Sequence, residues 1–172
     1  MKGFQTHLLV ILLAVVLLSC RKNEEFPLEP HIDFKDITHN KNIQGKDTSI
    51  TLIFSFTDGD GDVGFQKNES GPPFTGEYEY NFYVNYQEKN ASGQFVPVIV
   101  PTYVDSITPD GDIIVIIKYL PIQFTYRLPY MANSGRNKAI KGDIAVEINT
   151  FGFSPVSRLE FFMYDRALNK SN

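Results

Sequence analysis

Apolar side chains recur at every second position between residues 50 and 56, and this period of two constrains the fold more than any other feature of the chain. Ile50, Leu52, Phe54 and Phe56 share one parity, whereas Thr51, Ser55 and Thr57 share the other. Successive side chains of a β-strand point to opposite faces, whereas helices repeat every 3.6 residues. The segment is therefore predicted to be a strand with one face on a hydrophobic core.

Further segments show the same alternation, with Gly, Pro, Asn and Asp between them. The turn "KNASGQ" predicts a hairpin between the second stripe and "FVPVIV". No window from His31 onward shows a helical period over ten or more residues. The expected fold is an all-β, single antiparallel sandwich over residues 31–172, and an up-and-down barrel is the alternative. The further stripes are Tyr78, Tyr80, Phe82, Val84 and Tyr86, then Ile144, Val146 and Ile148, then Leu159, Phe161 and Met163.

The segment "DIIVIIKYL", residues 112–120, is apolar at both parities up to Lys118. Strands that are covered on both faces typically have such continuous apolar runs. We therefore expect this strand to be central to the core. Proline cannot donate to a strand ladder, so the prolines in this half of the chain are expected at edge strands or strand ends.

The N-terminal segment has the pattern of a secretory signal. Lys2 precedes an unbroken apolar run from Leu8 to Leu18, and Ser19 and Cys20 follow. Eleven residues of helix span about 16 Å, which is too short for a hydrocarbon core of roughly 30 Å. Residues 1–19 are therefore expected to be a cleaved signal peptide and no part of the fold.

The end of this run, Leu17-Leu18-Ser19-Cys20, resembles the bacterial lipobox, which implies that Cys20 becomes the lipidated N-terminus. Lipid on Cys20 would attach the protein to the membrane. Cys20 is the only cysteine, so no intrachain disulfide forms. Residues 20–30, which include "RKNEEFPLEP", are expected to be the lipidated cysteine and a tether. Lys22 and Glu24-Glu25 resemble the surface-export signal of Bacteroidetes lipoproteins, although Asn23 interrupts it. An outer-membrane lipoprotein on the cell surface and one that faces the periplasm both remain open.

The segments "FSFTDGDGD" and "DRALNKSN" together resemble uncharacterised Bacteroidetes-type lipoproteins with an immunoglobulin-like β-sandwich. The closing segment also resembles the "D-x-A-G-N-x-S" ending of bacterial immunoglobulin-like modules, with Leu168 where those usually have Gly. The resemblance implies a lipid-anchored sandwich, and proteins of this class often capture glycans.

Asp58, Asp60 and Asp62 follow the first predicted strand directly, and two glycines separate them. Their spacing matches the first three ligands of an EF-hand loop, and Glu69 falls at the twelfth place. Val63 stands where that loop needs glycine, and a strand precedes it, so this is no EF-hand. We expect a calcium site, with Asp165 and Asn169 as further candidate ligands. The alternative is a solvated turn, because Asp and Gly are common turn residues.

The residues indicate a binding role and no enzyme. The mature chain keeps two histidines, His31 and His39, and no free cysteine, and it has no GxSxG or HExxH motif. Cleavage leaves 15 basic and 20 acidic residues, which excludes the clustered positive charge of nucleic-acid binding. We expect an envelope module whose loops bind a glycan or a protein. A structural accessory subunit of an outer-membrane complex is the alternative. The tyrosines of residues 78–86 are expected to pack across strands, and Tyr83, which lies off the stripe, is the one whose exposure would favour sugar stacking.

Overall fold

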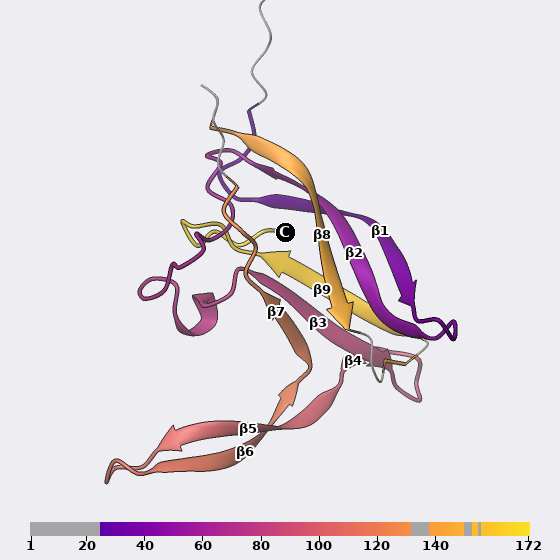
Figure 1. The fold of residues 1–172 in the computed structure, drawn as a ribbon, viewed down its shortest axis with the longest axis vertical. Helices are drawn as coiled ribbons and strands as arrows, with labels where there is room; N and C mark the ends of the chain where they lie inside the picture. The colour runs from indigo at the N-terminus through magenta and orange to yellow at the C-terminus, as the bar shows by residue number, and fades with distance from the viewer. Residues whose placement is uncertain (1–24, 132–137, 150–152, 155) are drawn as a thin grey trace, which may run out of the picture.

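The computed structural model describes residues 25–131, 138–149, 153–154 and 156–172, and these form an antiparallel all-β fold (Figure 1). The predicted signal peptide and Cys20 lie outside the described residues. The first strand begins at His31, where the sequence predicts the domain to begin. The elements are β1 (His31–Lys41), β2 (Asp47–Asp58), η1 (Gly76–Tyr78), β3 (Phe82–Lys89), β4 (Phe95–Pro97), β5 (Ile99–Ile107), β6 (Ile113–Pro121), β7 (Gln123–Tyr126), β8 (Ile140–Asn149) and β9 (Ser157–Met163).

Two sheets face each other, as the sandwich prediction requires. The first has the order β1-β2-β8, and in the second β3 pairs with β9 on one edge and with β4 and β7 on the other. Phe54 of β2 stacks on Phe82 of β3 across the interface, with ring centroids 4.9 Å apart. Side chains from both sheets therefore form one hydrophobic core, which contains Ile32, Ile50, Leu52, Phe54, Phe56, Val63, Phe82, Val84, Leu128, Val146, Ile148 and Met163.

The alternation in β2 is confirmed, because Ile50, Leu52, Phe54 and Phe56 are all buried. In β8 and β9 the predicted stripes also face the core, fully or in part. The prediction for β3 is confirmed only from Phe82 onward, since Tyr78 belongs to the short 3-10 turn η1. The hairpin through residues 90–94 joins β3 to β4 as expected.

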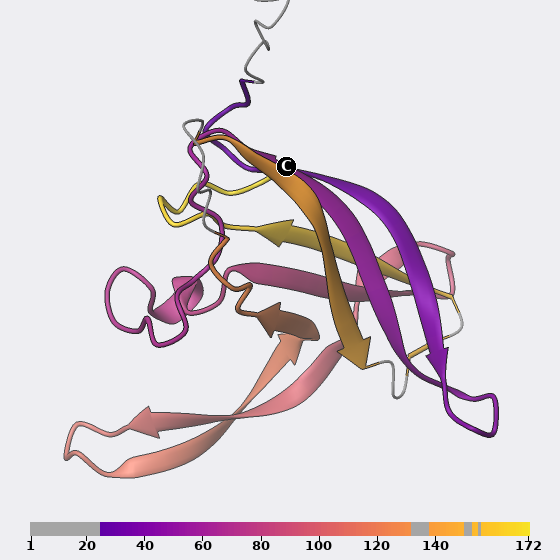
Figure 2. The same cartoon turned by 45° about the horizontal axis from the view of Figure 1, so that its top comes forward.

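The expectation that residues 112–120 form a central core strand is wrong. Among the described strands β6 pairs only with β5, and together they form a two-stranded ribbon that projects from the sandwich (Figures 1 and 2). We call this ribbon, residues 99–121, the arm. Ile113, Val115 and Ile117 are more than half exposed. A strand that is apolar on both faces is stabilised when both faces are buried. The sequence pattern does not show whether the same chain buries them or another molecule does.

Within the described residues, no helix is long and apolar enough to cross a membrane. Pro30, directly before β1, is buried, and the backbone of Phe26 and Pro27 lies against the loop after β2. The last part of the predicted tether therefore packs on the domain.

Candidate metal centre

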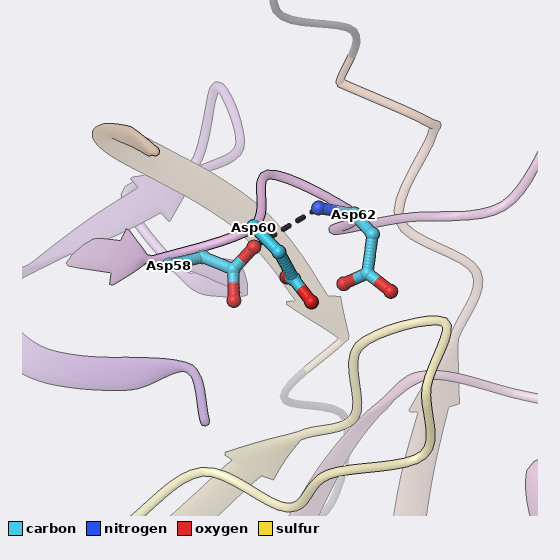
Figure 3. A group of neighbouring side chains, drawn as sticks. All are labelled: Asp58, Asp60 and Asp62. Carbon is cyan, nitrogen blue, oxygen red and sulfur yellow. Dashed lines mark hydrogen bonds between the residues drawn. The ribbon is translucent and has the colours of Figure 1, made fainter. Parts of the chain in front are cut away.

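Asp58, Asp60 and Asp62 lie together where β2 leaves the first sheet. Asp58 is the last residue of β2, and the chain turns at Gly59 and Gly61 so that all three carboxylates approach one another (Figure 3). One oxygen of each lies within 4.8 Å of the other two. Calcium binds oxygens at about 2.3 to 2.6 Å, so ligands on opposite sides of one ion lie up to about 5 Å apart. The spacing fits a single ion.

Each of the three aspartates has one buried oxygen without a hydrogen-bond partner among the described residues. These atoms are Oδ1 of Asp58, Oδ1 of Asp60 and Oδ1 of Asp62. The side chain of Asp58 is fully buried, and its other oxygen accepts the backbone N–H of Asp62 at 3.0 Å. An unpaired buried polar atom is costly, and a buried charge costs more. The loop therefore carries an electrostatic cost that a plain turn does not need.

The pKa values of the carboxyls express this cost. Burial, with the charges of Asp60 and Asp62 beside it, raises the pKa of Asp58 from 3.8 to about 7. Burial and then the charge of Asp165 raise the pKa of Asp62 to about 6. A carboxyl with a raised pKa in the folded state favours the fold while it is protonated. This contribution is lost as the pH rises from about 4 to about 7. The metal-free fold is therefore less stable at neutral pH than at about pH 4.

Backbone segments enclose residues 58–64, which we call the aspartate loop. A Cβ on Gly59 would lie 2.3 Å from the carbonyl oxygen of Phe26, and one on Gly61 would lie 1.9 Å from that of Lys138. Gly61 also has a positive φ of 71°, a conformation that glycine adopts readily. Val63, next in the loop, is fully buried. The loop is thus a packed part of the fold, unlike a solvated strand connection.

The C-terminal segment returns to this loop, as the ligand prediction for Asp165 requires. The N–H of Arg166 donates to the carbonyl oxygen of Asp62 at 3.2 Å, and Asp165 is fully buried. The Asp165 carboxylate already accepts two hydrogen bonds from Asn169, at 2.8 Å from its backbone N–H and 2.8 Å from its side-chain amide. Asp165 adds negative charge beside the three aspartates, and Asn169 orients it.

Glu69, the other predicted ligand, is not brought together with the three aspartates. Both of its oxygens bind the guanidinium of Arg166, and Glu69 Oε1 lies 2.6 Å from Arg166 Nη2. This contact with Arg166 lowers the pKa of Glu69. No sequence motif singles out Arg166, although it follows the candidate ligand Asp165 directly. Counting along an EF-hand pattern cannot reveal a partner 97 residues away in the chain.

The tyrosines of β3 pack as predicted and offer no sugar platform. Tyr83 is 7 % exposed and stacks on Phe162 at 5.1 Å, and Tyr86 is 1 % exposed and stacks on Phe153 at 4.2 Å. The Tyr83 hydroxyl donates to the backbone carbonyls of the turn around η1. Tyr83 and Tyr86 point to opposite faces of β3 and both are buried, so β3 is covered on both faces.

Comparisons of the chain with protein-family models, with curated proteins and with solved structures find no match.

Proposed function

We propose that this protein is a lipid-anchored, non-catalytic binding module of the cell envelope, in which the sandwich is stabilised by calcium bound at the aspartate loop. The observation that carries the calcium proposal is the set of three buried, unpaired carboxylate oxygens on Asp58, Asp60 and Asp62. A divalent cation supplies the positive charge and the partners that these oxygens lack. The lipid anchor rests on the lipobox resemblance around Cys20.

Calcium suits this site better than magnesium does. Calcium accepts six to eight oxygens in irregular geometry, whereas magnesium demands near-ideal octahedral geometry and keeps several waters. The aspartate loop offers several carboxylates on a backbone that turns at two glycines. Glu69 is left out of the ligand set, because Arg166 already neutralises it. Asp165 lies next to the loop and contributes negative charge that attracts the ion.

Bound calcium would stabilise the connection between distant parts of the chain. The loop contacts the segment after residue 25, Lys138 just before β8, and the C-terminal segment. An ion that binds the native state alone stabilises it by RT ln(1 + [L]/Kd), about 2.7 kcal/mol at a hundredfold excess over Kd. The chemistry is that of a structural ion, with no reaction at the metal.

The experiment is a thermal melt of the purified chain with calcium and with chelator. A rise of about 2 to 4 °C per kcal/mol predicts a calcium-dependent shift of roughly 5 to 10 °C. Asp60→Asn with Asp62→Asn removes two charges and keeps turn-forming side chains, so this double variant should lose the shift. The matched control is Asp110→Asn with Asp112→Asn, which changes the same Asp-Gly-Asp spacing in the exposed turn of the arm and should keep the shift.

Identical melting curves of the parent with calcium and with chelator would contradict the calcium proposal. The aspartate loop would then be a turn whose carboxyls take up protons. A calcium-dependent shift that survives in Asp60→Asn with Asp62→Asn would place the ion elsewhere.

The surface that best supports a binding role is the arm. Tyr103, Ile107, Ile113 and Tyr119 are each more than 70 % exposed there. Exposed contiguous apolar surface typically marks an interaction site. A projecting apolar ribbon fits a protein better than a glycan, since sugars are bound by concave sites with polar groups. This also favours the second candidate, an accessory subunit that packs against an envelope complex.

The anchor has its own test in Cys20→Ser. This variant cannot form the thioether with a diacylglycerol, so we expect an uncleaved or soluble chain that incorporates no labelled fatty acid. Radiolabelled fatty acid and membrane fractionation measure both properties. Normal labelling and normal membrane partitioning of the variant would contradict the lipid anchor.

A further inference from the structure

β6 has one strand partner in the described part of the chain, and its other edge is open. Among the described strands it pairs only with β5, through the register from Ile107↔Ile113 to Ile99↔Pro121. The outer edge therefore presents unpaired N–H and C=O groups along nine residues, a template for another strand. β5 is interrupted at Pro101, which has no N–H, whereas β6 has no proline before its last residue. The β6 edge is the better template.

The sequence at this edge is complementary to itself. Residues 112–118 read Asp-Ile-Ile-Val-Ile-Ile-Lys, with Val115 at the centre. In an antiparallel pair of two such strands about Val115, the residue k places before the centre lies opposite the residue k places after it. Isoleucine then faces isoleucine at every position between the ends, and valine faces valine. Asp112 faces Lys118 of the other strand at both ends of the pair.

The charged groups of Asp112 and Lys118 have no ion-pair partner in the described part of the chain. Lys118 lies opposite Thr102 within the arm, which offers no charge. Asp112 and Lys118 have the same parity as Ile114 and Ile116, so in the antiparallel pair opposite charges lie directly across from each other on one face. Such cross-strand pairs stabilise a sheet, whereas like charges destabilise it.

We propose that β6 pairs with β6 of a second copy of this chain, antiparallel and about a two-fold axis at Val115, so that two arms form one four-stranded sheet. The inference rests on the proposed function only in taking the arm as the binding surface, and it does not depend on calcium. The pairing satisfies the open edge and places the isoleucines of the two copies beside one another across the new strand pair.

A lipid bilayer fits the arm less well than a second copy does. Asp105, Asp110 and Asp112 lie at or near the tip, where insertion would place them in or against the membrane. Unpaired backbone groups of an open strand edge also find no partner in hydrocarbon. A second copy supplies both the backbone partners and the opposite charges.

Cysteine crosslinking of the full chain in its membrane or in detergent tests this register. Directly opposite residues of an antiparallel pair have Cα atoms about 4.5 to 5.5 Å apart, within the range of about 4.4 to 6.8 Å for a disulfide. Val115→Cys should therefore give a disulfide-linked dimer. Ile113→Cys is the matched control, because its two copies would be four residues out of register, about 13 Å apart. The parent, whose only cysteine is Cys20, measures the background.

Charge exchange supplies a second readout that leaves the core untouched. Lys118→Glu sets two acidic side chains opposite each other at both ends, and we expect the dimer to weaken at least about tenfold in sedimentation equilibrium. The exchange D112K/K118E restores opposite charges in the same register and should restore the dimer. Circular dichroism of both variants should match that of the parent.

Equal crosslinking of Val115→Cys and Ile113→Cys, or a monomeric parent, would overturn the β6 pairing. So would a dimer that is unaffected by Lys118→Glu. Crosslinking of Val115→Cys to a different protein would also overturn it. So would protection of the arm's backbone amides from hydrogen exchange that appears only when lipid vesicles are added. The first of these two results would leave the proposed binding function standing, whereas the calcium-dependent melt is unaffected by either.

Discussion

Phe54→Ala is expected to destabilise the domain by about 3 to 5 kcal/mol, the usual cost of truncating a buried phenylalanine. Phe54 is fully buried and contacts the second sheet through a ring stack on Phe82 and a tilted contact with Phe161 at 5.4 Å. Its loss leaves a cavity where the two sheets meet. At about 2 to 4 °C per kcal/mol, the melting temperature should fall by roughly 6 to 20 °C.

Phe34→Ala is the matched control, because Phe34 lies on the edge strand β1 and is 59 % exposed. This change should shift the free energy of unfolding by less than about 1 kcal/mol. Denaturant unfolding of both variants measures the difference. Equal losses from Phe34→Ala and Phe54→Ala would contradict the placement of the core between β2 and β3.

Gly64→Ala is expected to be nearly as damaging, for reasons of backbone geometry. Gly64 has a positive φ of 89°, and a Cβ there would lie 2.0 Å from the carbonyl oxygen of Pro129. The backbone would have to move, and two backbone hydrogen bonds hold it in place. The N–H of Phe65 donates to the carbonyl oxygen of Leu128 at 2.9 Å, and the N–H of Tyr130 donates to that of Phe65 at 2.8 Å. The strained φ and the lost hydrogen bonds together cost about 3 kcal/mol or more.

Gly45→Ala separates the two causes. Gly45 also has a positive φ, 75°, but a Cβ there would meet nothing within 4 Å. This variant carries only the φ cost, about 1 to 2 kcal/mol. Thermal unfolding of the pair measures the difference between them. If Gly64→Ala were no worse than Gly45→Ala, the close packing of the aspartate loop against residues 128–131 would be wrong.

Local pattern predicted the strands where one face is buried and the other is polar. β2, β8 and β9 are of this kind, and hydrophobic alternation alone placed their buried residues. The pattern could not place β6, because a strand that is apolar on both faces fits a core and an intermolecular sheet equally well. The immunoglobulin-like topology remains a prediction from the two short motifs, since the structure shows an antiparallel sandwich and no solved structure matches.

The candidate site was predicted in part. The cluster of Asp58, Asp60 and Asp62 could be predicted, because their spacing within five residues suffices to bring them together. The approach of Asp165 depends on the C-terminal segment crossing back to the end of β2, which only tertiary structure reveals. Glu69 matched an EF-hand place by counting, yet the fold supplies it with Arg166.

Leu168 adopts a backbone conformation that usually requires glycine. It stands where the resembling modules have glycine, and it has a positive φ of 66°. Its N–H donates to the carbonyl oxygen of Asp165 at 3.3 Å, and Asp165 and Asn169 hold the turn through their side chains. These bonds offset the cost of about 1 to 2 kcal/mol that a left-handed conformation imposes on a residue with a Cβ.

Isothermal titration calorimetry of calcium into chelator-stripped protein measures how many ions each chain binds and so tests the metal centre itself. We expect one calcium ion bound per chain, and no binding to the variant Asp60→Asn with Asp62→Asn although its strand spectrum is unchanged. The absence of calcium binding by the folded parent, or binding that the double variant retains in full, would contradict the calcium proposal.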